Sequence, residues 1–143
     1  MKRVVSNFLL FLALFGLVGC NDVSIIRQYQ VNSVFSYGSF EGNENKTEVS
    51  YSLDITGSKE DVANISKSEL IVNREYKELV LSNGEQMVTV IARQDDTTCL
   101  RVEGSIVFNT ENMNKEEISE MKLFDGIEIK DKDNRIHNYD LDK

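Results

Sequence analysis

Hydrophobic and polar residues alternate along two long segments of the chain. Residues 47–55 (TEVSYSLDI) place an apolar side chain at every second position, namely Val49, Tyr51, Leu53 and Ile55. Residues 100–108 (LRVEGSIVF) follow the same pattern with Leu100, Val102, Ile106 and Phe108. Successive side chains of a strand point to opposite faces, so a period of two is typical of a half-buried β-strand. The pattern predicts two strands that each turn one face to a hydrophobic core.

A third apolar segment has a different pattern. Residues 86–92 (QMVTVIA) are apolar on both faces, which predicts a strand at the centre of a sheet. The dipeptide Asn83-Gly84 stands between this segment and residues 76–82 (YKELVLS). Because Asn-Gly readily adopts the backbone conformation of a two-residue turn, it predicts a tight hairpin at this position.

One segment has the features of a short helix. In NMNKEEISEMK, Asn114 can cap the first turn, and Glu117 stands three residues further on as the reciprocal capping partner. We expect a single short helix near 115–122, with Ile118 and Met121 as the side chains that face the core.

The end of the chain predicts a second hairpin. Residues 123–130 (LFDGIEIK) and 135–141 (RIHNYDL) read as strands, and Asp-Lys-Asp-Asn joins them as a turn rich in turn-forming side chains. The same region is similar to a calcium loop through Asp131 and Asp133, but Arg135 occupies a ligand position and the turn glycine is missing. We therefore predict no metal site there.

These elements together predict a mainly β protein. Roughly seven short strands with turns about 8–12 residues apart favour an antiparallel β-sandwich, and a small open β-barrel is the alternative. The sequence contains neither internal repeats nor a linker, so we expect one domain over residues 31–143. Residues 20–30 are expected to form a short tether or the first strand.

The beginning of the chain has the pattern of an export signal. Lys2 and Arg3 give a basic start, and residues 8–15 (FLLFLALF) give an apolar segment. This segment is shorter than the roughly 20 residues of a membrane-spanning helix. The small residue Gly19 and then Cys20 follow it, as expected near a cleavage point. The alternatives are an ordinary signal peptide cut elsewhere and an anchor helix that is retained.

The run Leu17-Val18-Gly19-Cys20 resembles the lipobox of bacterial lipoproteins. The resemblance implies that residues 1–19 are a signal peptide and that a diacylglycerol unit, carrying acyl chains such as palmitate, alkylates the Cys20 thiol. Two acyl chains suffice for stable attachment where one does not. The implied location is the extracytoplasmic side of the cell membrane, and the covalent lipid is the only cofactor-like group expected.

The charge of the chain narrows the range of partners. The formal net charge is −8, and it becomes −10 once Lys2 and Arg3 leave with the signal peptide. Nucleic-acid binding needs clustered basic residues, so we expect no nucleic-acid partner. Attraction to anionic lipid head groups is equally disfavoured. We expect bilayer contact through the Cys20 lipid alone, with an envelope protein as the further partner.

Two residues, Cys99 and His137, are candidates for chemistry. Lipidation of Cys20 would leave Cys99 as a free thiol without an intramolecular partner. Alternation places Cys99 on the face of Arg101 and Glu103, whereas free cysteines are usually buried, and we favour burial over a redox role or an intermolecular disulfide. The one histidine, His137, is predicted to be a partly buried strand residue rather than a base for Cys99. No catalytic residues are therefore assigned.

The segment Gly104-Ser-Ile-Val-Phe108 resembles a late strand, written Gly-x-x-x-Phe, of immunoglobulin-like domains in Gram-positive surface lipoproteins. The resemblance implies an immunoglobulin-like sandwich with a loop or short helix and a last hairpin after this strand. The expected function is a binding or accessory module of the cell envelope, not an enzyme. A structural or stress-related envelope lipoprotein without a discrete ligand is the alternative, and a thiol-dependent redox protein or enzyme is less favoured.

Overall fold

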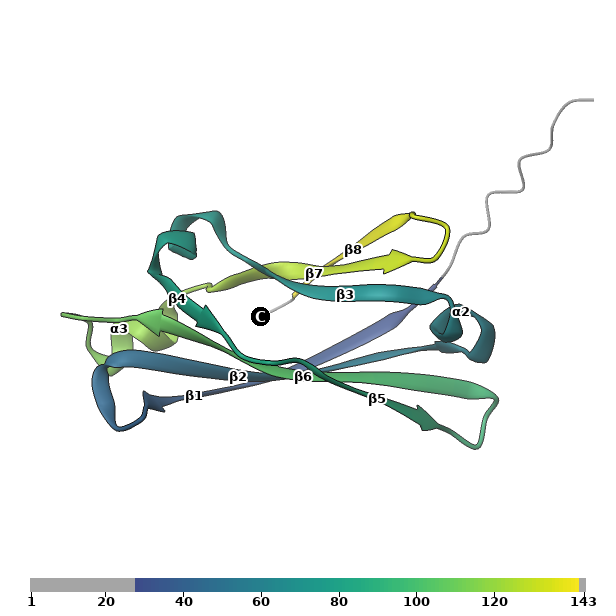
Figure 1. Cartoon of the computed structure of the whole chain (residues 1–143), viewed down its shortest axis with the longest axis horizontal. Helices are drawn as coiled ribbons and strands as arrows, with labels where there is room; N and C mark the ends of the chain where they lie inside the picture. Colours follow the sequence, from purple (N-terminus) through teal and green to yellow (C-terminus); the bar gives the residue numbers. More distant parts are fainter. Residues whose placement is uncertain (1–27, 142–143) are drawn as a thin grey trace, which may run out of the picture.

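The computed structural model describes residues 28–141 and contains two antiparallel β-sheets packed face to face (Figure 1). The large sheet has the strand order β1-β2-β6-β4, and β5 also pairs with β6. Its strands are β1 (Gln30–Phe40), β2 (Asn43–Ser58), β4 (Val80–Asn83), β5 (Met87–Ala92) and β6 (Thr97–Asn109). The small sheet has the order β3-β7-β8, formed by β3 (Ile65–Val72), β7 (Phe124–Asp131) and β8 (Ile136–Asp140). The predicted antiparallel sandwich is confirmed, and the two sheets remain separate instead of forming the alternative barrel.

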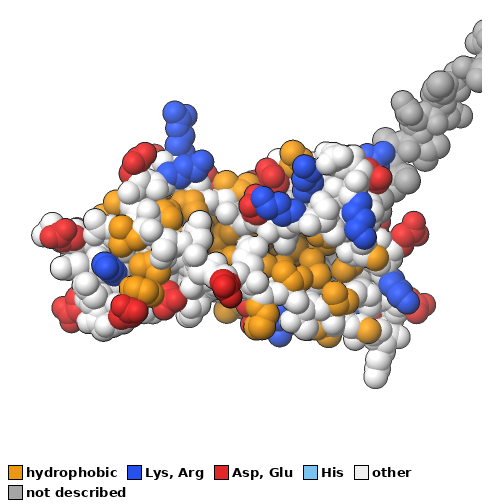
Figure 2. Space-filling model, in the orientation of Figure 1, with side chains coloured by type: hydrophobic (Ala, Val, Ile, Leu, Met, Phe, Trp, Pro, Cys, Tyr) orange, Lys and Arg blue, Asp and Glu red, His pale blue; other side chains and the backbone are white. Residues whose placement is uncertain are grey.

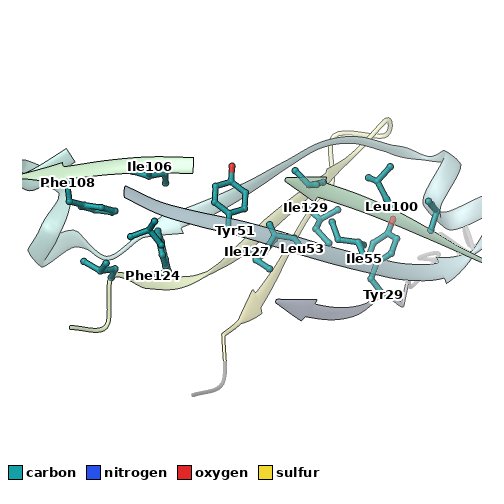
Figure 3. Close-up of a cluster of buried hydrophobic side chains, with 14 residues drawn as sticks. Tyr29, Tyr51, Leu53, Ile55, Leu100, Ile106, Phe108, Phe124, Ile127 and Ile129 are labelled. Atoms are coloured by element: carbon teal, nitrogen blue, oxygen red, sulfur yellow. The ribbon is translucent and has the colours of Figure 1, made fainter. Parts of the chain in front are cut away.

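The hydrophobic core lies between the two sheets and is built from the predicted alternating faces (Figure 3). The fully buried side chains come from β2, β6 and β7; they include Val49, Leu53, Ile55, Val102, Phe108, Ile127 and Ile129. The ring of Phe124 stacks on Phe35 at a centroid distance of 5.1 Å and meets Phe108 edge-on at 6.1 Å. Both sheets therefore contribute to one core, which all described strands except β5 line or adjoin.

The predicted short helix is confirmed as α3 (Lys115–Glu120). Of the two side chains expected to face the core, Met121 packs against it, whereas Ile118 is not among the residues that do. The Asn114 side chain accepts a hydrogen bond from the Glu117 N–H at 2.9 Å, and the Glu117 carboxylate accepts one from the Asn114 N–H at 2.8 Å. Two other helical segments were not predicted: α2 (Lys59–Ala63) and the 3-10 helix η1 (Arg74–Leu79). Both begin after a polar cap, because the side chains of Ser58 and Asn73 accept hydrogen bonds from the first turn.

The prediction that residues 86–92 form a central strand is wrong. Among the described strands, β5 pairs with β6 and with no other, so it lies at an edge of the large sheet. Its side chains are exposed on both faces, with Met87 at 60%, Val88 at 56% and Val90 at 66%. An apolar sequence on both faces therefore marks exposed surface in this strand, and not burial between layers.

The predicted hairpin at Asn83-Gly84 is also absent. Strand β4 pairs with residues 106–108 of β6, and β5 pairs with residues 98–103 of the same strand. The two short strands thus follow one another along one edge of β6 instead of pairing together. The Gly84 N–H donates to the Ser105 carbonyl at 2.8 Å, which holds this link against β6.

The predicted C-terminal hairpin is confirmed, since β7 and β8 pair in an antiparallel register that matches Ile129 with His137. The proposed signal peptide, Cys20 and most of the expected tether lie outside the described residues. Within residues 28–141, the structure has no helix with the length and apolar character needed to cross a membrane.

Candidate functional site

A cleft of about 720 Å³ lies between the two sheets. It lies where the edge strand β3 of the small sheet faces β4 and the following link in the large sheet. Its apolar walls are formed by Leu70, Ile71, Val72, Val80 and Ile106. Figure 2 shows hydrophobic side chains along this band between the sheets, continuing toward β5.

A tyrosine reaches the cleft from the core. Tyr51 on β2 stands opposite Gly104 on β6, and a Cβ atom at Gly104 would lie only 2.6 Å from the Tyr51 hydroxyl oxygen. The missing side chain therefore gives the phenol ring its place in the sheet. The Tyr51 Oη atom accepts a hydrogen bond from Gln86 Nε2 at 2.9 Å. This pair supplies a polar point inside an otherwise apolar wall.

Charged side chains surround the cleft on the small-sheet side. Glu69 on β3 stands directly opposite Glu128 on β7, and both line the cleft together with Lys77 from η1. Lys67 forms an ion pair with Glu69 at 2.5 Å and has Lys130 opposite it. The rim therefore carries both signs of charge around an apolar interior, an arrangement typical of sites that bind apolar groups with a few polar contacts.

Two strand edges border the cleft and leave backbone groups available for pairing. Strand β3 pairs with β7 on one side, and β4 pairs with β6 on one side. An extended peptide can add to such an edge through main-chain hydrogen bonds and place alternate side chains in an apolar groove. The lining residues supply carboxylates, an amine, amides and a phenol as polar groups.

A second hollow of about 530 Å³ lies at the opposite side of the sandwich. Phe35 and Tyr37 from β1 line it together with the end of α3 and the start of β7. The ring of Phe35 stacks on Phe124, so part of this hollow belongs to the core contact between the sheets. It is smaller than the cleft at β3 and β4, and its apolar lining is shared with the core.

The structure places Cys99 at 0% exposure, as expected for a free cysteine. The predicted register is also confirmed, because Cys99 shares the outer face of β6 with Arg101. Arg101 forms a bidentate ion pair with Asp54 of β2, with N–O distances of 2.7 and 2.8 Å. These hydrogen bonds, the positive charge of Arg101 and a hydrogen bond from the Cys99 thiol hold the pKa of the Asp54 carboxyl below its usual range.

His137 is a partly buried strand residue, as predicted, and it packs against Tyr29 inside the sandwich with ring centroids 5.6 Å apart. Its Nε2 atom lies 3.4 Å from Oδ2 of Asp131, a carboxylate that is almost completely buried. Cys99 points to the opposite face of the large sheet, so the structure does not bring these two residues together.

The interpretation of residues 131–134 as a hairpin turn is confirmed. Asp131 Oδ1 accepts a hydrogen bond from the Arg135 N–H at 2.8 Å, and Asn134 has a positive φ of 63° that suits a tight turn. Within residues 28–141, the structure contains no group of three or more His, Cys, Asp or Glu side chains arranged to hold a metal ion.

Comparison with protein-family models, with curated proteins and with solved structures finds no match to this chain. The resemblances to the lipobox and to immunoglobulin-like domains therefore stay predictions from the sequence. The cleft itself was not predicted, because its walls come from segments far apart in the chain that only the packing of two sheets brings together.

Proposed function

We propose that this chain is a lipoprotein of the bacterial cell envelope, attached to the membrane through Cys20, and that its β-sandwich acts as a binding module. The observation that carries the anchor is the run Leu17-Val18-Gly19-Cys20 after a short apolar segment. The partner in this proposal is an envelope protein, and the contact with the bilayer is the covalent lipid.

The cleft between β3 and β4 supports the binding part of the proposal. Its volume of about 720 Å³ falls within the usual range of ligand sites, and its walls combine apolar side chains with the Tyr51–Gln86 polar pair. Two open strand edges beside an apolar groove suit an extended apolar segment of the partner.

The anchor is tested by metabolic labelling with palmitate in a bacterial host. We expect the wild-type chain to take up label and to sediment with membranes, and we expect Cys20→Ala to lose both properties. Cys99→Ala is the matched control, because it removes the other cysteine and should keep the label. Unchanged labelling of Cys20→Ala, or none in the wild type, would contradict the proposed attachment.

The binding module is tested by capture from solubilised envelope membranes. Asn83→Trp places an indole at an exposed position that lines the cleft, so we expect it to lose the partner that the wild type retains. Ser36→Trp adds the same side chain at an exposed position of β1, on the other side of the sheet, and should retain it. If the chain is instead a structural envelope protein without a discrete ligand, the wild type and both variants should capture the same proteins.

A further inference from the structure

Strand β5 is an edge without the usual protection against pairing with another strand. Natural edge strands carry charges, proline or bulges that discourage such pairing. From Gln86 to Ala92 the sequence has no charge, no proline and no glycine, and Met87, Val88 and Val90 are more than half exposed. Edge strand β3, in contrast, carries the ion pair between Lys67 and Glu69.

The sequence around β5 is complementary to itself when it is reversed. Thr89 stands at the centre, valines flank it on both sides, and the oppositely charged residues Glu85 and Arg93 stand four positions away at either end. In an antiparallel pair of two such strands centred on Thr89, Val88 meets Val90 of the second copy. Glu85 and Arg93 lie just outside the two ends of β5. In this pair each Glu85 is on the side of an Arg93 of the other copy, close enough for two ion pairs related by two-fold symmetry.

The backbone of β5 is compatible with this register. The Arg93 N–H donates to the Thr97 carbonyl at 3.1 Å. The same antiparallel register sets Ile91 opposite Cys99. Since backbone groups alternate along a strand, the odd-numbered residues bond to β6, and Val88 and Val90 present their N–H and C=O groups to the open edge. A pair centred on Thr89 matches these two residues with each other.

We propose that β5 pairs antiparallel with β5 of a second copy of this chain, centred on Thr89, so that the two large sheets join into one continuous sheet. In this pair the exposed side chains of Val88 and Val90 pack beside Val90 and Val88 of the other copy, on the same sheet face as the core residues Leu100 and Val102. Six residues per strand bury less surface than a standard protein interface, so the dimer forms and dissociates reversibly. This inference does not depend on the lipid anchor or on the cleft.

Disulfide trapping of the full chain in intact expressing cells, whether or not it is attached to the membrane, tests the register directly. Opposite residues of a non-hydrogen-bonded antiparallel pair have Cα atoms about 4.5 Å apart, a separation that a disulfide can bridge. We therefore expect Thr89→Cys to give a non-reduced species of twice the monomer mass after mild oxidation. The wild-type chain is the control for any disulfide-linked dimer that its natural cysteines form.

Met87→Cys is the matched control, because it lies on the same exposed strand and the same face, two residues from the symmetry axis. Its two copies would be four strand positions apart, roughly 13 Å, which exceeds the reach of a disulfide. We expect little dimer from it alone, and a strong dimer when Met87→Cys and Ile91→Cys chains are mixed. Equal trapping of Met87→Cys and Thr89→Cys would overturn the proposed register.

Charge reversal gives a second readout. In the Thr89→Cys background, Glu85→Lys places like charges at both ends of the pair, and we expect the trapped dimer to fall several-fold. Adding Arg93→Glu restores opposite charges and should restore the yield. A yield that ignores both changes, a Thr89→Cys chain that stays monomeric, or a trapped species of another mass would each overturn the proposal.

Discussion

Strands β6 and β5 are neighbours in the large sheet, yet they have opposite environments. β6 has a strand on each side and the small sheet above it, so Val102 and Phe108 are fully buried. β5 has β6 on one side, and its Val88 and Val90 stand opposite the core residues Val102 and Leu100. Both valines are nevertheless more than half exposed. The comparison teaches that burial depends on what covers a strand, and not on how apolar the strand is.

The largest expected effect comes from truncating a buried side chain of β6, and truncation of an exposed side chain of β5 is the control. Phe108→Ala removes a fully buried ring that contacts Phe124, and we expect a loss of about 3–5 kcal/mol in the free energy of unfolding. Val90→Ala removes an exposed side chain and should change the same quantity by less than about 0.5 kcal/mol. Urea denaturation of dilute protein, in which a reversible dimer has dissociated, measures both values. Equal losses would show that β5 is as buried as β6.

The second prediction compares glycines at the centre and at the edge of the sheet. Gly104 on β6 leaves room for Tyr51, so Gly104→Ala should displace the ring and cost about 1–3 kcal/mol. A Cβ atom at Gly38, on the edge strand β1, would have no neighbour within 4 Å. Gly38→Ala should therefore raise the free energy of unfolding by about 0.4–1 kcal/mol, because alanine lowers the conformational entropy of the unfolded chain.

Thermal unfolding of the two glycine variants, followed by circular dichroism, gives the sign of each change. A neutral Gly104→Ala variant would mean that Tyr51 can move without loss. A strongly destabilised Gly38→Ala variant would mean that the edge strand β1 is packed as tightly as the centre.

Local patterns predicted the elements whose structure depends on neighbouring residues. Alternation identified β2 and β6, and the capping residues Asn114 and Glu117 identified α3, because these signals act within a few positions. The position of β5 in the sheet depends on which strand lies beside it, and residues 86–92 do not encode that neighbour. The Asn83-Gly84 signal failed for the same reason, since β6 pairs with the segments on both sides of it.

The candidate site was less predictable than the fold. The cleft joins Tyr51, Leu70 and Val80, which come from three strands in two sheets, and no periodicity links them. The ion pair between Asp54 and Arg101 shows the same limit. Alternation puts both residues on the polar faces of their strands, but only the register of β2 against β6 sets them opposite each other.

This ion pair gives the smallest of the expected effects, on the outer face of β6. Asp54→Asn removes the carboxylate that Arg101 holds, and we expect a loss of at most about 1 kcal/mol at neutral pH, because the pair is partly exposed. The pKa of Asp54 is lowered in the folded state, so its contribution is fully present above the unfolded value, near pH 4. It is lost as the pH falls through the lower folded value. Urea denaturation from pH 7 to pH 2 should therefore show that the free energies of unfolding of the wild type and Asp54→Asn converge in acid. Glu111→Gln is the control, because it removes an exposed carboxylate from a turn. Its free energy of unfolding should stay within about 0.5 kcal/mol of the wild-type value at neutral pH. A constant difference between wild type and Asp54→Asn would mean that the ionised carboxylate contributes nothing to the stability of β6.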